Sequence, residues 1–261
     1  MKKATLPWRI AHRGARREAP DNTQPALKKA LTYPIDGIEF DVQMSVDGIP
    51  VLYHDRTIWR LEHRRKRIAD LAFSELKTLD WGVWFSPAFS GEPPLTLVGA
   101  LDVLHACPRL LIELKSNPRD RRSGHVRRLT ETVVSILKQK RYGPLQHRTL
   151  ILSFDPDVLA RAHDLAPEYR YVLNSSDGSP SCLRDLPDML VRNLWAVDIH
   201  IGKLTAEWAH WAADRTLRLM TYTCNNIPQV EKALALGADA IISDRPLWLA
   251  DHLAQHFARV S

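Results

Sequence analysis

The sequence has few cysteines and no long apolar run. Its three cysteines, Cys107, Cys182 and Cys224, are odd in number and widely spaced, and none lies in a CxxC pair. A disulfide framework needs paired cysteines, so this pattern indicates a reducing compartment. No stretch approaches the roughly 20 consecutive apolar residues that a membrane-spanning helix needs, which argues against stable membrane insertion.

The N-terminal segment is only partly similar to a secretion signal. Lys2 and Lys3 suit the basic start of a signal peptide, but Pro7, Arg9 and His12 interrupt the apolar run that should follow. We therefore predict a cytoplasmic protein.

The net charge of +6 fits an anionic substrate or partner, but it is also common on ordinary soluble surfaces. The densest basic segment, residues 60–67, reads RLEHRRKR and is interpreted as a solvated loop. Because no aromatic interleaving or nucleic-acid motif accompanies it, no nucleic-acid partner is predicted. No heptad or apolar surface stripe indicates an oligomeric state.

The length and pattern of the chain predict one domain, residues 1–261, of α/β class. Short β-branched runs alternate with longer amphipathic stretches such as 126–140 and 229–236, as in β/α units with a parallel sheet. Eight such units in this length favour a TIM-type (β/α)8 barrel over an open sheet. The predicted strands are 8–12, 37–42, 110–114, 149–153, 169–173, 195–199, 218–222 and 240–243.

A small insertion is expected after the second strand, between residues 44 and 109. Asp47-Gly48 is a tight-turn dipeptide, and the strand-like run 49–54 after it is placed as a hairpin return. The rest of the insertion has short helical patterns at 74–79 and 97–106. A long connection on a barrel is usually a functional segment over the active face.

Acidic residues gather at the predicted carboxyl ends of neighbouring strands. Side chains alternate along a strand, so Glu39 and Asp41 share one face, and Glu113 occupies the matching place on the next strand. TIM barrels carry their catalytic groups at this end. Three crowded carboxylates need neutralisation, and a divalent cation with oxygen ligands, Mg²⁺ or Ca²⁺, is the natural answer. The alternative is a salt bridge from Glu39 or Asp41 to Lys115 or Arg13.

Two histidines are expected at the same mouth of the barrel. His12 ends the first strand, and His54 returns there if the hairpin folds back. Histidine suits acid and base chemistry near neutral pH, because its pKa lies in that range. A single histidine at a strand end is usually structural, but two beside three carboxylates favour catalysis.

The residues that carry these expectations resemble the glycerophosphodiester phosphodiesterase family. The likeness consists of separated fragments that keep the order of that family and cover nearly the whole chain. They are HRG at 12–14, PDNT at 20–23, GIEFDV at 37–42, DGIPV at 47–51, HD at 54–55, GEP at 91–93, IELK at 112–115, SF at 153–154 and GADAIISDRP at 237–246.

The resemblance implies a barrel that holds Mg²⁺ or Ca²⁺ through Glu39, Asp41 and Glu113 and hydrolyses glycerophosphodiesters to glycerol 3-phosphate and an alcohol. It also implies roles for six further residues. In this family His12 and His54 match the catalytic pair, Arg13 and Lys115 match phosphate-binding residues, and Tyr222 and Asn225 match positions expected to contact the substrate.

The sequence departs from the family pattern at two places. Asp21 stands where the family usually has glutamate, and Tyr222 stands where tryptophan is usual, so the reach of Asp21 and the head-group pocket are in question. Three other functions remain alternatives: a lysophospholipase D or sphingomyelinase D activity, a phosphodiester-binding protein without catalysis, and a nucleic-acid hydrolase. The absence of a cysteine framework and of a strand-tracking basic stretch disfavours the first and the third.

Overall fold

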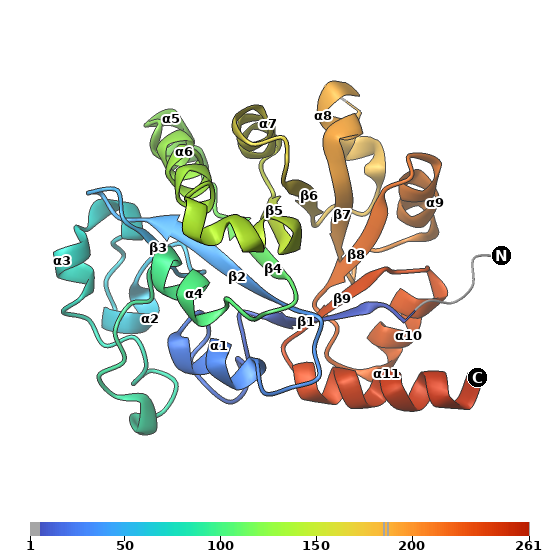
Figure 1. Ribbon diagram of the computed structural model, residues 1–261, viewed down its shortest axis with the longest axis horizontal. Coiled ribbons are helices and arrows are strands. Elements are labelled where there is room, and N and C mark those ends of the chain that lie inside the picture. The colour runs from blue at the N-terminus through green and yellow to red at the C-terminus, as the bar shows by residue number, and fades with distance from the viewer. Residues whose placement is uncertain (1–5, 185, 187, 261) are drawn as a thin grey trace.

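The computed structural model describes residues 6–184, 186 and 188–260, and its centre is a closed parallel barrel (Figure 1). Eight parallel strands follow one another in the order β1-β2-β4-β5-β6-β7-β8-β9, and β9 pairs with β1 to close the ring. The predicted TIM-type barrel is confirmed. The strands are β1 Trp8–His12, β2 Gly37–Met44, β3 Pro50–Leu52, β4 Leu110–Leu114, β5 Thr149–Ser153, β6 Arg170–Ser175, β7 Leu194–His200, β8 Arg218–Tyr222 and β9 Ala240–Ser243.

Helices surround the barrel, with α5 to α8 along the top of the view, α9 at its right, and α11 beneath β1 and β9 (Figure 1). Within the described ranges, none of them is long and apolar enough to cross a membrane. The α-helices are α1 Gln24–Ala30, α2 Trp59–Glu62, α3 Phe73–Leu76, α4 Leu97–Val103, α5 Pro118–Arg122, α6 His125–Leu137, α7 Pro156–Leu165, α8 Asp188–Asn193, α9 Ala206–Asp214, α10 Ile227–Ala235 and α11 Pro246–Val260.

Alternation along the strands separates two cores. On β2, Ile38 and Phe40 point outward into the layer between barrel and helices, while Glu39 points inward. The inner cluster fills the barrel axis below the mouth with small and branched apolar side chains. Its members are Ile10, Leu111, Leu150, Leu152, Val172, Ala196, Met220, Ala240 and Ile242.

The insertion after β2 has a small core of its own and lies at the left of Figure 1. It begins with the predicted hairpin, in which β3 pairs antiparallel with β2. Trp81 is 3% exposed in this core, and its indole Nε1 donates to the Leu76 carbonyl at 3.0 Å. Trp84 donates to the Trp81 carbonyl at 2.9 Å. Both tryptophans therefore pack the insertion together.

Two details of the chain differ from the sequence expectations. Helix α6 ends at Leu137 rather than at residue 140, because Gln139 takes an extended backbone conformation before a 3₁₀ segment. The basic run 60–67 is not a solvated loop throughout, because Arg60 lies in helix α2 and its side chain is largely buried. Lys2 and Lys3, read above as part of a signal-like start, lie outside the described residues.

Gly14 in the HRG motif is expected to tolerate no side chain. Its φ is +82°, and an added Cβ would lie 2.6 Å from the carbonyl carbon of Ala26. Gly14→Ala should therefore lower the free energy of unfolding by about 2–4 kcal/mol, from left-handed strain and overpacking together. Gly48→Ala is the matched control, because Gly48 has φ +87° but open space around it. In urea unfolding the control should lose about 1–2 kcal/mol, and equal losses would contradict the close contact.

Candidate active site

A cavity of ≈ 130 Å³ opens at the carboxyl ends of the barrel strands. Most of its polar side chains come from strand ends, which is where TIM barrels carry catalytic groups. His12 comes from β1, Glu39 from β2 and Glu113 from β4, while Leu152 and Ile242 belong to the inner apolar core beneath. The lining residues are His12, Arg13, Glu39, His54, Glu113, Lys115, Leu152, Phe154, Asn174, Asp198, Tyr222, Thr223 and Ile242.

The three acidic residues singled out from the sequence form one cluster. Asp41 and Glu113 are directly paired in the register of β2 and β4, and Glu39 lies two residues earlier on the same face. One oxygen from each carboxylate lies within 4.8 Å of the others, and all three side chains are buried. A Glu–Asp–Glu cluster of this size can hold a metal ion.

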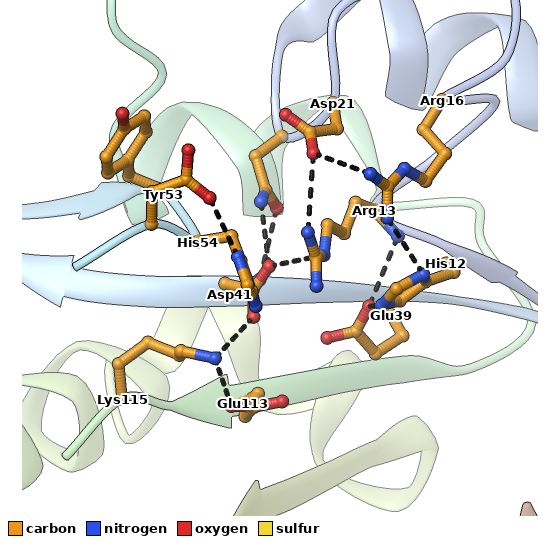
Figure 2. Close-up of polar contacts among 12 residues, drawn as sticks. His12, Arg13, Arg16, Asp21, Glu39, Asp41, Tyr53, His54, Glu113 and Lys115 are labelled. Carbon is orange, nitrogen blue, oxygen red and sulfur yellow. Dashed lines mark hydrogen bonds and ion pairs between the residues drawn. The ribbon is translucent and has the colours of Figure 1, made fainter. Parts of the chain in front are cut away.

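Two basic side chains compensate part of this negative charge (Figure 2). The Arg13 Nε lies 2.9 Å from Asp41 Oδ2, and the Lys115 Nζ lies 3.2 Å from Asp41 Oδ1 and 2.6 Å from Glu113 Oε1. The barrel salt bridge considered as an alternative is therefore present for Asp41. Glu39 has no comparable ion pair, and among the described atoms its Oε1 has no hydrogen-bond partner.

Because of these contacts, the pKa values of Asp41 and Glu39 shift in opposite directions. Burial opposes ionisation of Asp41, but the charges of Lys115 and Arg13 hold its pKa well below the usual range. Burial raises the pKa of Glu39 well above the usual range, and the negative charges of Asp41 and Glu113 add to the effect. The cluster thus favours a further cation beside Glu39.

His12 is held by a carboxylate that follows the last strand. Its Nδ1 donates to Asp244 Oδ1 at 2.6 Å, which leaves Nε2 facing Glu39, with 3.9 Å between Nε2 and Glu39 Oε2. Burial lowers the pKa of His12 to about 4, and the charge of Arg13 acts in the same direction. Asp244 in turn accepts from Asn225 Nδ2 at 2.8 Å.

His54 reaches the mouth from the insertion side, as the hairpin predicted. Its Nδ1 lies 3.0 Å from Asp55 Oδ1, and its side chain is 36% exposed. Arg60 fixes Asp55 through an ion pair of 3.1 Å from its Nε to Asp55 Oδ2. The guanidinium of Arg60 also stacks 4.0 Å from the ring centre of Trp84. Arg60, from the basic run 60–67 that was predicted to be solvated, therefore holds Asp55 in place beside His54 at the cavity mouth.

Asp21 links the first loop to the insertion despite its short side chain. Its Oδ1 lies 3.0 Å from Arg60 Nη1, and its Oδ2 lies 3.4 Å from Arg13 Nη1 and 3.5 Å from Arg16 Nη2. Its side chain is 1% exposed. The aspartate at this departure from the family pattern thus contacts three arginines from a buried position, and Figure 2 shows its contacts with Arg13 and Arg16.

The run YTCN at 222–225 contains two residues that were expected to contact the substrate, and they lie in different places. Tyr222 lines the cavity, and its hydroxyl donates to the Ser175 carbonyl at 3.2 Å, so the polar atom is turned away into a bond with the backbone. Asn225 is not among the residues that line the cavity; it is bonded to Asp244. Cys224 in the same run is buried, and burial raises the pKa of its thiol to about 12.

Sequence reasoning missed three polar residues of this region. Asn174 and Asp198 line the cavity, and Asp244 binds His12. The strand alternation used for Glu39 would have found the first two, because each faces inward near the end of a strand. Asp244 comes directly after β9, and only closure of the barrel brings it to His12, 232 residues away in sequence.

A TIM barrel with acidic, basic and histidine side chains gathered at its carboxyl mouth has the architecture of a barrel enzyme. Comparison with known proteins identifies the enzyme family. The sequence profile of the glycerophosphoryl diester phosphodiesterase family matches residues 12–247. The chain belongs to this family of enzymes, as its separated motifs indicated.

Individual relatives agree with this assignment. The chain is 31% identical over 247 residues to a putative glycerophosphodiester phosphodiesterase, YhdW, of Bacillus subtilis, covering 91% of this chain and 94% of the relative. It is 28% identical over 242 residues to a glycerophosphodiester phosphodiesterase of Caldanaerobacter subterraneus, covering 91% and 93%. Among solved structures, an Oleispira antarctica phosphodiesterase in complex with the product sn-glycerol-3-phosphate superposes with a TM-score of 0.82 at 29% identity, over 94% of this chain and 96% of that one.

Proposed function

We propose that this protein hydrolyses glycerophosphodiesters to sn-glycerol 3-phosphate and an alcohol, using a divalent cation and the pair His12 and His54. One observation carries the proposal: in a chain of this family, a buried carboxylate cluster, two basic side chains and both histidines lie at one cavity. The Oleispira relative, solved with sn-glycerol-3-phosphate bound, supports the choice of product.

The cation would be held by Glu39, Asp41 and Glu113. The donor set consists only of carboxylate oxygens, which suits Mg²⁺ or Ca²⁺ and not a structural zinc site. The buried Glu39 Oε1 without a partner supports this assignment, because a cation would satisfy it. When bound, such a cation orients the phosphate and withdraws charge from its oxygens.

Arg13 and Lys115 are the residues proposed to hold the phosphate. Both line the cavity, and both are fixed by Asp41, so their positive charges are oriented before a substrate arrives. The planar guanidinium of Arg13 offers paired donors, while Lys115 offers a compact charge. Tyr222 would close the cavity as an apolar wall.

His12 and His54 are proposed to move the protons of the reaction. The glycerol 2-hydroxyl attacks phosphorus as one imidazole accepts its proton, and the other imidazole protonates the departing alkoxide, which leaves a cyclic phosphate. Water then attacks phosphorus and gives a proton to the second imidazole, while the first returns its proton to the glycerol 2-oxygen, so that the ring opens to sn-glycerol 3-phosphate and both histidines are restored. In each ring Nδ1 is bonded to an aspartate, Asp244 for His12 and Asp55 for His54, which leaves Nε2 available for transfer. Asn225 is proposed to position His12 through Asp244 and not to contact the substrate.

Asp244→Asn should lower kcat by roughly 10²-fold, within the range of about 10²–10⁴ that a positioned histidine contributes. The amide keeps the shape but no longer selects the His12 tautomer with a proton on Nδ1. Steady-state kinetics on glycerophosphocholine measures the effect. Asp47→Asn is the control, because Asp47 bonds Ser45 and Phe73 on the insertion instead. Equal kcat for Asp244→Asn and wild type would contradict the positioning role.

The proposed function is tested by the identity of the products. Phosphorus NMR of glycerophosphocholine incubated with the protein and Mg²⁺ should show conversion to sn-glycerol 3-phosphate, with choline released in equal amount. Formation of phosphocholine and glycerol would contradict the proposed bond cleavage. Reaction with lysophosphatidylcholine alone would instead support the lysophospholipase D alternative.

A further inference from the structure

Two polar side chains on the cavity wall have acceptor oxygens that no group of the described residues satisfies. Asn174 on β6 and Asp198 on β7 are direct register partners, so their inward side chains lie side by side. They are 5% and 1% exposed. Within the described part of the chain, Asn174 Oδ1 and Asp198 Oδ1 have no hydrogen-bond partner. Buried acceptors are nearly always satisfied, so a ligand of this cavity is the expected donor.

The surroundings offer no substitute for such a ligand. The Asn174 amide Nδ2 donates to Glu113 Oε2 at 3.3 Å, which aims the carbonyl Oδ1 away from the carboxylate cluster. The hydroxyl of Tyr222, which lines the same cavity, donates to the Ser175 carbonyl. Leu152 and Ile242 beneath are apolar. The pair therefore forms a small polar subsite at an apolar floor.

We propose that Asp198 and Asn174 bind the terminal C1 hydroxyl of the glycerol moiety and so select phosphodiesters in which that hydroxyl is free. This inference rests on the proposed function. The phosphate belongs beside the basic side chains Arg13 and Lys115, which come from the β1 and β4 ends of the cavity. The glycerol end then extends toward β6 and β7.

The chemistry of the pair favours a neutral hydroxyl over the other groups of the substrate. A phosphate oxygen carries no proton to donate and would be repelled by a carboxylate, and a choline head group has no N–H. An acyl ester at C1 removes the donor and leaves both oxygens buried without a partner.

The test compares two substrates that differ only by the terminal CH₂OH group that carries this hydroxyl. Glycerophosphocholine carries it, whereas 2-hydroxyethyl phosphocholine keeps the attacking hydroxyl and lacks the terminal CH₂OH group. We expect the wild type to favour glycerophosphocholine in kcat/KM by about 10- to 100-fold, the scale of one buried hydrogen-bonding group left unpaired. In Asp198→Leu this ratio should fall toward 1, while Asp198→Asn, which keeps an acceptor, should retain most of it.

Asp36→Asn is the control, because Asp36 pairs with Arg9 at the opposite end of the barrel and should leave the ratio unchanged. Asp198→Leu removes a buried acceptor without a partner, so it should fold at least as stably as the wild type, and Asp198→Ala provides a second variant. An unchanged ratio in these folded, active variants, or faster hydrolysis of lysophosphatidylcholine than of glycerophosphocholine by the wild type, overturns the inference alone. Hydrolysis of neither test substrate by the wild type overturns both the proposed function and the inference.

Discussion

His12→Ala is expected to lower kcat for glycerophosphocholine by about 10²–10⁴-fold, with a much smaller change in KM. The reason is geometric: His12 lines the cavity, and its bond to Asp244 leaves Nε2 turned toward the carboxylate cluster. Alanine removes the ring that is proposed to transfer the proton, while the basic side chains that are proposed to bind the phosphate stay in place. The measurement is release of sn-glycerol 3-phosphate under saturating substrate.

The control for this loss is His105→Ala. The His105 side chain is exposed, its Nδ1 lies 3.0 Å from the Asp102 carbonyl oxygen, and it is not among the residues that line the cavity. Its removal should leave kcat within about twofold, as expected for a surface change away from the site. Because His12 and His54 are proposed to act in one proton-transfer sequence, the double alanine variant should be barely slower than either single variant. A folded His12→Ala protein with the kcat of the wild type would contradict the proposed pair.

Asp41→Asn and Glu39→Gln are expected to differ in their effect on the free energy of unfolding, although both should weaken metal binding. Asp41 holds ion pairs with both Arg13 and Lys115, so Asp41→Asn leaves two cations poorly compensated in a buried site. In EDTA this variant should lose about 3 kcal/mol of unfolding free energy, the scale of a broken buried ion pair. Glu39 Oε1 has no partner, so Glu39→Gln should lose less than about 1 kcal/mol under the same conditions.

Mg²⁺ or Ca²⁺ is expected to raise the melting temperature of the wild type. Both substitutions remove one carboxylate from the cluster, so both should abolish this rise. Urea unfolding in EDTA and thermal unfolding across a metal titration measure the two effects. Glu131→Gln is the matched control, because Glu131 pairs with Arg127 and Arg161 on the helical surface. An unaltered metal response in Glu39→Gln would contradict the assigned ligand set.

The framework of the site could be predicted from the sequence because it depends on local rules. Strand alternation places Glu39 and Asp41 on one face, and parallel neighbours bring Glu113 level with Asp41, as their register pairing confirms. The turn at Gly48 predicts the hairpin that brings His54 back to the mouth. Each of these inferences needs only the periodicity of a strand and the direction of its neighbour.

The supporting contacts could not be predicted in the same way. Arg60 reads as part of a solvated basic run, and its contact with Asp21 depends on how the insertion packs over the first loop. Asn225 follows a strand end as a substrate-binding residue should, yet its side chain donates to Asp244 and is not among the residues that line the cavity. Side-chain directions in loops are set by tertiary packing, which no local pattern encodes.

The central claim is that this barrel cleaves glycerophosphodiesters with the help of a cation held by Glu39, Asp41 and Glu113. The most direct measurement is release of sn-glycerol 3-phosphate from glycerophosphocholine by wild type and His54→Ala, each with Mg²⁺ and with excess EDTA. We predict release by the wild type with Mg²⁺, loss of release in EDTA, recovery when Mg²⁺ is restored, and a large loss in His54→Ala. Undiminished release in EDTA, or no release from any glycerophosphodiester by the folded protein supplied with Mg²⁺, would contradict the account.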